Sequence, residues 1–144
     1  MFKNLRSGFT IIELLITVAI VGVLMLFASI SYISLRQRAA LNSTVDELVG
    51  AARAVQGWAI AGQDGTATQC LSVSATEIKS PCGCSGSACK LQTNILSGIT
   101  ITPVGDVNFN RLTGLPTAGV TFTINSGSLP QKTVIIGLNG KISS

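Results

Sequence analysis

Four cysteines are the residues of this chain with the most evident capacity for chemistry. They are Cys70, Cys82, Cys84 and Cys89, in a chain of 144 residues. Four thiols can form two disulfides, or as thiolates they can hold one metal ion. Their spacing is not that of paired Cys-x2-Cys zinc knuckles, and they follow a long apolar run. We therefore expect two disulfides in an oxidising compartment, and no metal site.

The spacing of the cysteines also limits how they can pair, because four cysteines allow three connectivities. A bridge between Cys82 and Cys84 is strained, since only one residue separates them. Two pairings stay open: Cys70–Cys82 with Cys84–Cys89, or Cys70–Cys84 with Cys82–Cys89. We favour the first.

A second group of candidate residues lies near the N-terminus, where Gly8 and Phe9 precede a single carboxylate at Glu13. Because Gly8 has no side chain, extended backbone at this point can enter a protease site, and Gly8–Phe9 is a candidate cleavage point. Residues 14–30 carry no charge. A secretory signal places its apolar stretch before the cleavage site. Here the stretch follows the site, so it stays in the mature chain.

The composition gives catalysis little support. The chain contains no histidine, which removes the commonest general base and metal ligand. It has no glycine-rich phosphate loop and no pair of carboxylates at a useful spacing. The net charge is +4, and without Lys3 and Arg6 of residues 1–8 it is +2, which is too small to indicate a nucleic-acid partner. We therefore expect neither an enzyme nor a cofactor.

The N-terminal residues are expected to form one long helix. Residues 9–35 contain no proline, and as a helix they are long and apolar enough to cross a bilayer core of about 30 Å. Arg36 and Arg38 mark the end of this run, where they can meet lipid headgroups, acids of a neighbouring molecule, or solvent. Within residues 36–62, apolar residues then recur at spacings of four and three, which is the pattern of an amphipathic helix. Its apolar stripe consists of Leu41, Val45, Leu48, Ala52, Val55 and Ala59.

The residues from 66 to 144 show the period of two that is typical of strands. Val120, Phe122 and Ile124, for example, alternate with polar residues. We expect five or six short strands in an antiparallel sheet or small sandwich, covered by the apolar stripe. The cysteine-rich residues 74–93 are predicted to form a disulfide-tied loop. The expected fold class is therefore α+β.

This order of features resembles the type IV pilins and pseudopilins. The resemblance is carried first by the Gly8, Phe9 and Glu13 signal, the retained apolar run and the cysteine-containing domain behind it. Further positions are similar to the GspH/FimT branch of that family. They are residues 51–54, Cys70, residues 106–109, 113–114, 120–124, 134–136 and 140–142. The resemblance implies the type IV pilin-like fold.

The resemblance also implies a division of the chain. Residues 1–8 are then a leader that is cleaved off, residues 9–35 a transmembrane helix that later forms the filament core, and residues 36–144 a periplasmic pilin domain. Within that domain residues 36–62 are the amphipathic helix and residues 66–144 the β-rich part. Many pilins have a proline where Ile30 stands here, so we expect an uninterrupted helix.

The resemblance also implies that another protein modifies the N-terminal residues. A prepilin peptidase is expected to cleave after Gly8 and to methylate the amine of Phe9. Glu13 is expected to form a salt bridge with the Phe9 amine of a neighbouring subunit. The alternative for Glu13 is an interfacial carboxylate that helps to cap the helix.

The implied function is that of a minor type IV pilin, a structural subunit that helps to prime pilus assembly and is incorporated near the tip. Its expected partners are other pilin and minor pilin subunits, the prepilin peptidase and methyltransferase, an inner-membrane assembly platform, and membrane lipid before assembly. Lys3 and Arg6 would keep the leader in the cytoplasm. The chain would then be a single-pass protein of the bacterial inner membrane with its C-terminal domain in the periplasm, and later part of the pilus.

Two alternatives remain at this point. The first is a type II secretion pseudopilin with the same fold. The second is a DNA receptor at the pilus tip, because some members of the branch bind DNA through paired arginines near the C-terminus. Residues 140–144 contain one lysine and no arginine, so DNA is not an expected partner.

Overall fold

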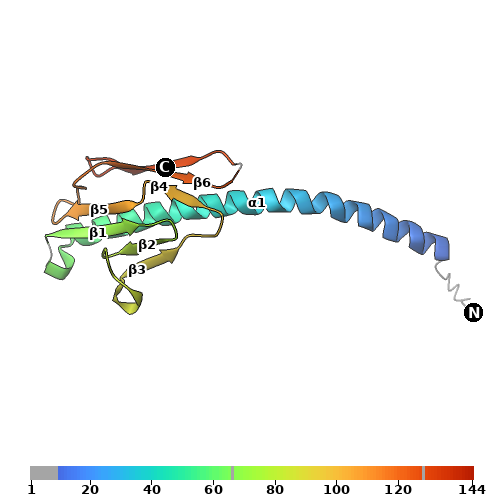
Figure 1. Ribbon diagram of the computed structural model, residues 1–144, viewed down its shortest axis with the longest axis horizontal. Coiled ribbons are helices and arrows are strands. Elements are labelled where there is room, and N and C mark those ends of the chain that lie inside the picture. The colour runs from blue at the N-terminus through green and yellow to red at the C-terminus, as the bar shows by residue number, and fades with distance from the viewer. Residues whose placement is uncertain (1–9, 66, 128) are drawn as a thin grey trace, which may run out of the picture. The chain divides into compact units, whose positions relative to one another are not determined.

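The computed structural model describes residues 10–65, 67–127 and 129–144, apart from the side chains of residues 27–31 and 64. These residues form one long helix, eight strands and two short 3-10 helices (Figure 1). The chain divides into two units, with the boundary between Arg36 and Gln37. The predicted leader, residues 1–8, lies outside the described residues.

Helix α1 extends over Ile11–Ile60 without interruption, as the absence of a proline predicts. At its start, the hydroxyl oxygen of Thr10 accepts a hydrogen bond from the Glu13 N–H at 3.3 Å. A threonine followed three residues later by a glutamate is a common start signal for helices. At its end, Gly62 has φ +65° and donates its N–H to the carbonyl of Ala59, as a glycine that ends a helix often does.

The strands form two antiparallel sheets of four strands each. The first has the order β3-β2-β1-β5, with β1 Thr68–Val73, β2 Glu77–Ser80, β3 Leu91–Asn94 and β5 Gly105–Asn110. The second has the order β4-β6-β7-β8, with β4 Thr100–Thr102, β6 Val120–Asn125, β7 Lys132–Ile136 and β8 Ile142–Ser143. The 3-10 helices are η1 Gln63–Gly65 and η2 Gly86–Ala88. Among the described residues an isolated bridge pairs Phe109 of β5 with Pro116 in the connection from β5 to β6.

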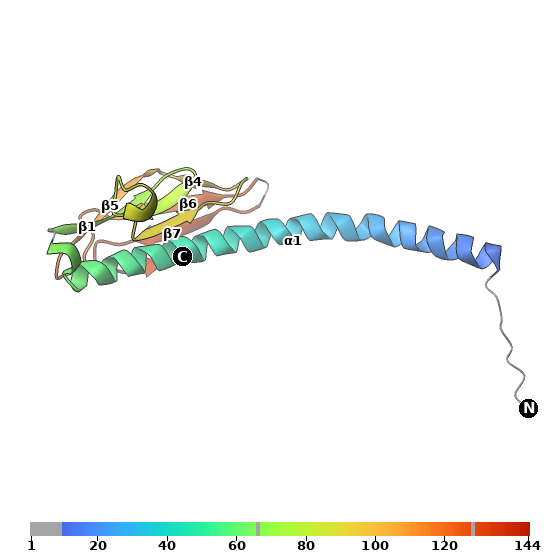
Figure 2. The same cartoon turned by 90° about the horizontal axis from the view of Figure 1, so that it is seen from below.

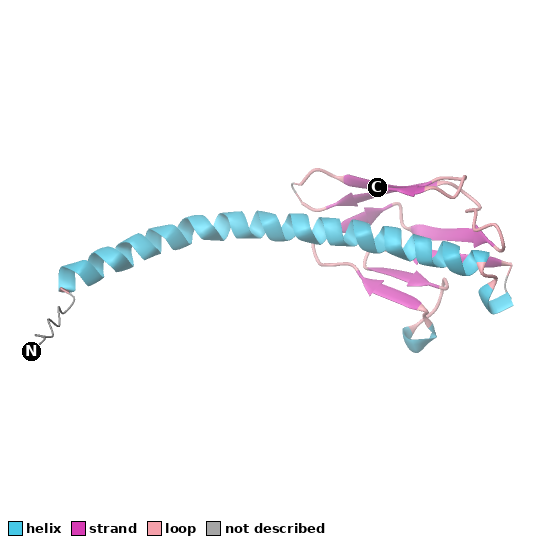
Figure 3. Ribbon diagram, turned by 180° about the vertical axis from the view of Figure 1, so that it is seen from behind, coloured by secondary structure: helices cyan, strands magenta, loops and turns pink. Residues whose placement is uncertain are grey.

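A single buried core joins the apolar stripe of α1 to both sheets. Every residue of the predicted stripe is at most 3% exposed, and Phe109 of β5 and Phe122 of β6 are as deeply buried. Figure 3 shows the second half of α1 running across both groups of strands, and in Figure 2 the strands lie on one side of it. The predicted α+β fold, a long helix packed on antiparallel sheet, is confirmed. All residues of this core lie between Leu41 and Ile142, so the unit from Gln37 to Ser144 has its own core.

The prediction of five or six strands was wrong, because β2 and β3 lie in the segment expected to be a loop. Each of these strands has only four residues, and their exposed faces are polar. They are stabilised by pairing with each other and with β1, so their partners are brought together only in the folded chain. Alternation over four residues is too short a signal among so many serines and glycines.

Gly114 marks a close approach between α1 and the turn that leads from β5 to β6. It has φ +63°, and a Cβ at this position would lie 2.6 Å from Cγ1 of Ile60. We expect Gly114→Ala to lower the free energy of unfolding by about 1–3 kcal/mol, measured by urea denaturation. Gly57→Ala is the matched control, because open space surrounds that position in the helix. It should raise the free energy of unfolding by about 0.5–1 kcal/mol, and equal effects of the two changes would contradict this account.

Candidate functional site

The first half of α1 presents a contiguous apolar surface. Every described side chain from residue 10 to residue 26 is exposed in the single chain, with Ile11 at 83% and Leu26 at 72%. We call this the N-terminal apolar surface; it consists of Ile11, Ile12, Leu14, Leu15, Ile16, Val18, Ile20, Val21, Val23, Leu24, Met25 and Leu26. A soluble monomer rarely exposes so large an apolar area. The surface therefore indicates contact with other protein chains or with lipid.

The predicted membrane span over residues 9–35 is not found in the described part of the chain. Within that part, no helix has both the length and the apolar character that crossing a membrane requires. Phe9 and the side chains of residues 27–31 lie outside what the structure describes.

Glu13 is the one carboxylate within this apolar surface, in the first turn of α1. Within the described residues its carboxylate forms no ion pair. The backbone N–H of Glu13 donates a hydrogen bond to the Thr10 hydroxyl, so Thr10 caps the start of the helix. Glu13 therefore remains available for a cation from outside the chain. Gly8 and Phe9, the predicted cleavage and methylation residues, lie outside the described residues, and their roles stay predictions.

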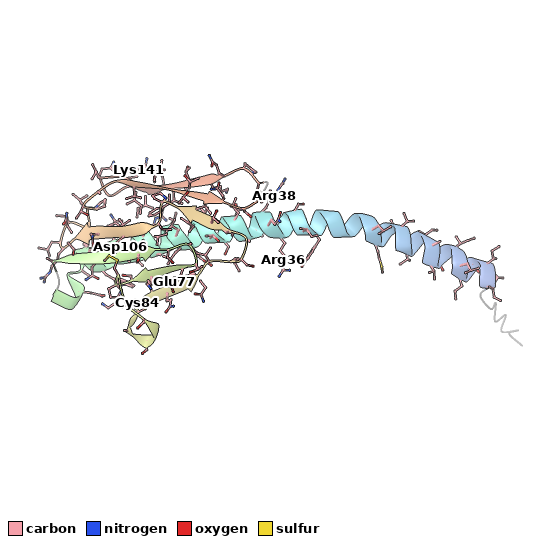
Figure 4. The ribbon with its side chains drawn as sticks, viewed as in Figure 1. Arg36, Arg38, Glu77, Cys84, Asp106 and Lys141 are labelled. Atoms are coloured by element: carbon pink, nitrogen blue, oxygen red, sulfur yellow. A yellow bond between two sulfur atoms is a disulfide. The ribbon has the colours of Figure 1, made fainter. Side chains whose placement is uncertain are left out.

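The four cysteines are all oxidised in the structure. Cys70 of β1 is bonded to Cys82, which follows β2, and their Cα atoms are 5.4 Å apart. Cys84 and Cys89 are bonded to each other on either side of η2, with Cα atoms 5.2 Å apart. This is the first of the two pairings left open by the sequence. Figure 4 labels Cys84 at the base of the η2 turn.

The sulfurs of the first disulfide lie near a carboxylate, in the only such cluster that the described residues form. Ligand atoms of Cys70, Cys82 and Asp106 lie within 4.8 Å of one another. Metal ions bind thiolates, and both sulfurs here are already joined in a disulfide. In its oxidised form the cluster therefore lacks the thiolate ligands that a metal site needs.

The two disulfides should differ in how much they stabilise the domain. The Cys70–Cys82 bridge spans 12 residues and the Cys84–Cys89 bridge spans 5. Cross-linking a longer loop removes more entropy from the unfolded chain. We expect Cys70→Ser with Cys82→Ser to lower the free energy of unfolding by about 3 kcal/mol, and Cys84→Ser with Cys89→Ser by about 2 kcal/mol, in urea titrations. A larger loss from the second pair would contradict the entropic explanation.

The polar face of β2 and β3 is held by an ion pair. Lys79 donates a hydrogen bond from Nζ to Oε1 of Glu77 at 2.8 Å, and Gln92 donates one from Nε2 to Oε2 at 3.1 Å. The hydrogen bond from Lys79, followed by its positive charge, lowers the pKa of the Glu77 carboxyl below its usual value of 4.5. These charges are satisfied within the sheet, so this face offers no strong charge to a partner.

A groove that sequence reasoning missed lies beside α1 near its entry into the domain. We call it the basic groove; it has a volume of about 570 Å³ and is lined by Arg38, Leu41, Asn42, Leu129, Pro130, Gln131 and Lys132. Its two walls are one turn of α1 and residues 129–132, which lead into β7. Nothing in the local sequence of either wall indicates the other, since only the folded domain brings them together.

Comparison with known proteins gives the same picture for the N-terminus and the fold. Residues 3–29 match the family model of the prokaryotic N-terminal methylation motif. No match was found among the curated proteins.

The fold is shared with the type IV minor pilin FimU of Pseudomonas aeruginosa strain PAO1, known in two crystal forms. For one form the TM-score is 0.60 at 15% identity, covering 74% of this chain and 88% of that chain. For the other it is 0.57 at 14% identity, covering 71% and 90%. At such low identity the likeness shows the fold alone. The chain thus combines a prepilin-type N-terminal motif with the type IV pilin fold.

Proposed function

We propose that this type IV pilin-like chain is a minor type IV pilin, a structural subunit that helps to prime pilus assembly and is incorporated near the tip. The observation that carries the proposal is the N-terminal methylation motif over residues 3–29, which overlaps the start of a pilin-fold helix. The N-terminal apolar surface supports it, since such a surface needs partners. The role is structural rather than enzymatic.

Before assembly, the chain is held in the bacterial inner membrane by residues 9–35, with residues 36–144 in the periplasm. The disulfides fit that oxidising compartment. The prepilin peptidase cleaves after Gly8 and methylates the amine of Phe9. Cleavage leaves a short N-terminus ahead of the apolar helix, which the inner-membrane assembly platform then moves from lipid into the filament.

In the filament, the N-terminal apolar surface packs against the helices of other pilin and minor pilin subunits. Removing apolar area from contact with water contributes roughly 25 cal/mol per Å², although before assembly lipid already covers part of this surface. The exposed carboxylate of Glu13 pairs with the Phe9 amine of a neighbouring subunit. Such a pair in apolar surroundings mainly specifies the axial register of the subunits.

Mass spectrometry of the mature protein, with immunoblots of sheared pili, tests this function. We expect the mature chain to begin at methylated Phe9 and to be present in the sheared fraction. An unprocessed chain that still starts at Met1 would contradict the proposal. A type II secretion pseudopilin with the same fold is the alternative function, and deletion of the gene distinguishes the two. Loss of pili would support the minor pilin. Loss of protein secretion would support the pseudopilin.

A further inference from the structure

The basic groove combines two cations with an apolar base. Arg38 and Lys132 both line it and both are exposed, whereas Leu41 at its base is only 3% exposed. Arg38, Leu41 and Asn42 are three and four residues apart, so they share one face of α1. In the described residues neither cation takes part in an ion pair. The groove therefore offers positive charge that the domain itself does not neutralise.

The opposite wall is fixed in place by the second sheet. Lys132 opens β7 and is paired in register with Ile124 of β6. The N–H of Leu129 donates to the carbonyl of Ser126 at 3.0 Å, which closes the turn before it. Figure 4 labels Arg38 beside α1. The two cations thus come from two elements far apart in the sequence, α1 and β7.

The remaining lining residues match the chemistry of a phosphate ester. Arginine binds phosphate oxygens with a fork of donors, and lysine adds a point charge. The side-chain amides of Asn42 and Gln131 can donate further hydrogen bonds, and Leu129 and Pro130 give the rim an apolar part. No carboxylate is found among the described lining residues. A volume of about 570 Å³ lies in the range of small-molecule sites.

The position of the groove along α1 selects the source of that phosphate. Arg38 follows residue 35, the end of the apolar run, by three residues, which is about 4.5 Å of helix rise. In a membrane-anchored chain this is the level of the lipid headgroups. We propose that the basic groove binds the phosphate of an anionic phospholipid headgroup on the periplasmic face of the membrane. This inference rests on the proposed inner-membrane location.

Lipid binding at this site gives the stored subunit a defined resting position. The headgroup holds the domain against the membrane surface, and extraction into the filament must break that contact. A carboxylate of a neighbouring subunit is the competing occupant of the groove after assembly. The level of the groove beside the end of the apolar run favours lipid before assembly.

Vesicle binding by residues 37–144, which contain the whole buried core, tests the proposal. Vesicles of phosphatidylcholine with and without phosphatidylglycerol are sedimented with the protein at low ionic strength. We expect binding only to the vesicles that contain phosphatidylglycerol. Arg38→Gln and Lys132→Gln should each weaken binding about five-fold, and the double variant about 25-fold.

A matched control separates the groove from general attraction between charges. Arg53→Gln with Lys141→Gln removes the same charge from exposed positions outside the groove lining. This pair should weaken binding by less than about two-fold, because screening limits distant charges. Equal losses in the two double variants would overturn the proposal. All variants should keep the wild-type midpoint of urea unfolding.

Two further results would also overturn the lipid assignment. One is binding of inorganic phosphate alone as strongly as vesicles, which would make the groove a site for free phosphate. The other is a wild-type domain that binds neither kind of vesicle. In that case, reduced pilus incorporation of the Arg38 and Lys132 double variant would show that the groove binds a neighbouring subunit instead of lipid. None of these results depends on methylated Phe9, so they are distinct from failure of the proposed function.

Discussion

In pili sheared from cells that express the Glu13→Ala chain, we expect the subunit to be at least about ten-fold less abundant than wild type. In the proposed pairing, the change leaves the Phe9 amine of a neighbouring subunit without a counter-charge in the apolar filament core. Removing one member of a buried pair costs about 3–5 kcal/mol. Cleavage and methylation should continue, because Glu13 lies beyond the proposed cleavage site, and mass spectrometry of the membrane fraction checks this.

The controls for Glu13 separate pairing from helix capping. Thr10→Ala removes the hydroxyl that accepts the Glu13 N–H, at a cost of about 1 kcal/mol, but keeps the carboxylate. We expect this variant to enter pili at close to the wild-type level, and Glu13→Gln to behave like Glu13→Ala. An equal loss in the Thr10 and Glu13 variants would assign Glu13 to capping. Normal incorporation of Glu13→Ala would exclude the pairing.

Leu48→Ala should lower the free energy of unfolding of residues 37–144 by about 2–5 kcal/mol. Leu48 is 0% exposed and lies in the middle of the apolar stripe, within the core that both sheets share. A loss of this size is a large part of the 5–15 kcal/mol that stabilises a typical domain. Urea denaturation, followed by the fluorescence of Trp58, measures it.

The adjacent Glu47 provides the comparison for Leu48. Glu47 is exposed, and its Oε1 accepts a hydrogen bond from the Ser43 hydroxyl at a long 3.4 Å. Glu47→Ala should change the free energy of unfolding by no more than about 0.5 kcal/mol. If Leu48→Ala cost as little, the apolar stripe would not be what holds α1 to the sheets.

The helix and its contact face could be predicted because their signals are local. The spacing of four and three from Leu41 to Ala59 shows which face of the helix is apolar, whatever that face packs against. The stop at Gly62 depends only on the backbone freedom of glycine. Val120, Phe122 and Ile124 alternate clearly, and they lie in β6 where the pattern predicts a strand.

The parts that could not be predicted depend on contacts between distant segments. Strands β2 and β3 have weak alternation of their own, and their partners lie elsewhere in the chain. The basic groove is lined by both Arg38 and Lys132, which lie far apart in the sequence, and each of them alone is an ordinary surface cation. Glu13 was identified because a lone carboxylate in an apolar run is unusual in itself.

The way α1 is fastened to the sheets has a mechanical consequence. The side-chain amide of Gln56 donates to the carbonyls of Gly114 and Gly140, both at 3.1 Å, and so fastens the helix to two separate turns. The two sheets meet α1 through one core, without a hydrogen-bonded ladder between them in the described residues. A pull along α1 is therefore shared by both sheets in parallel, in a shearing direction. In the proposed filament under tension, neither sheet therefore has to separate strand by strand.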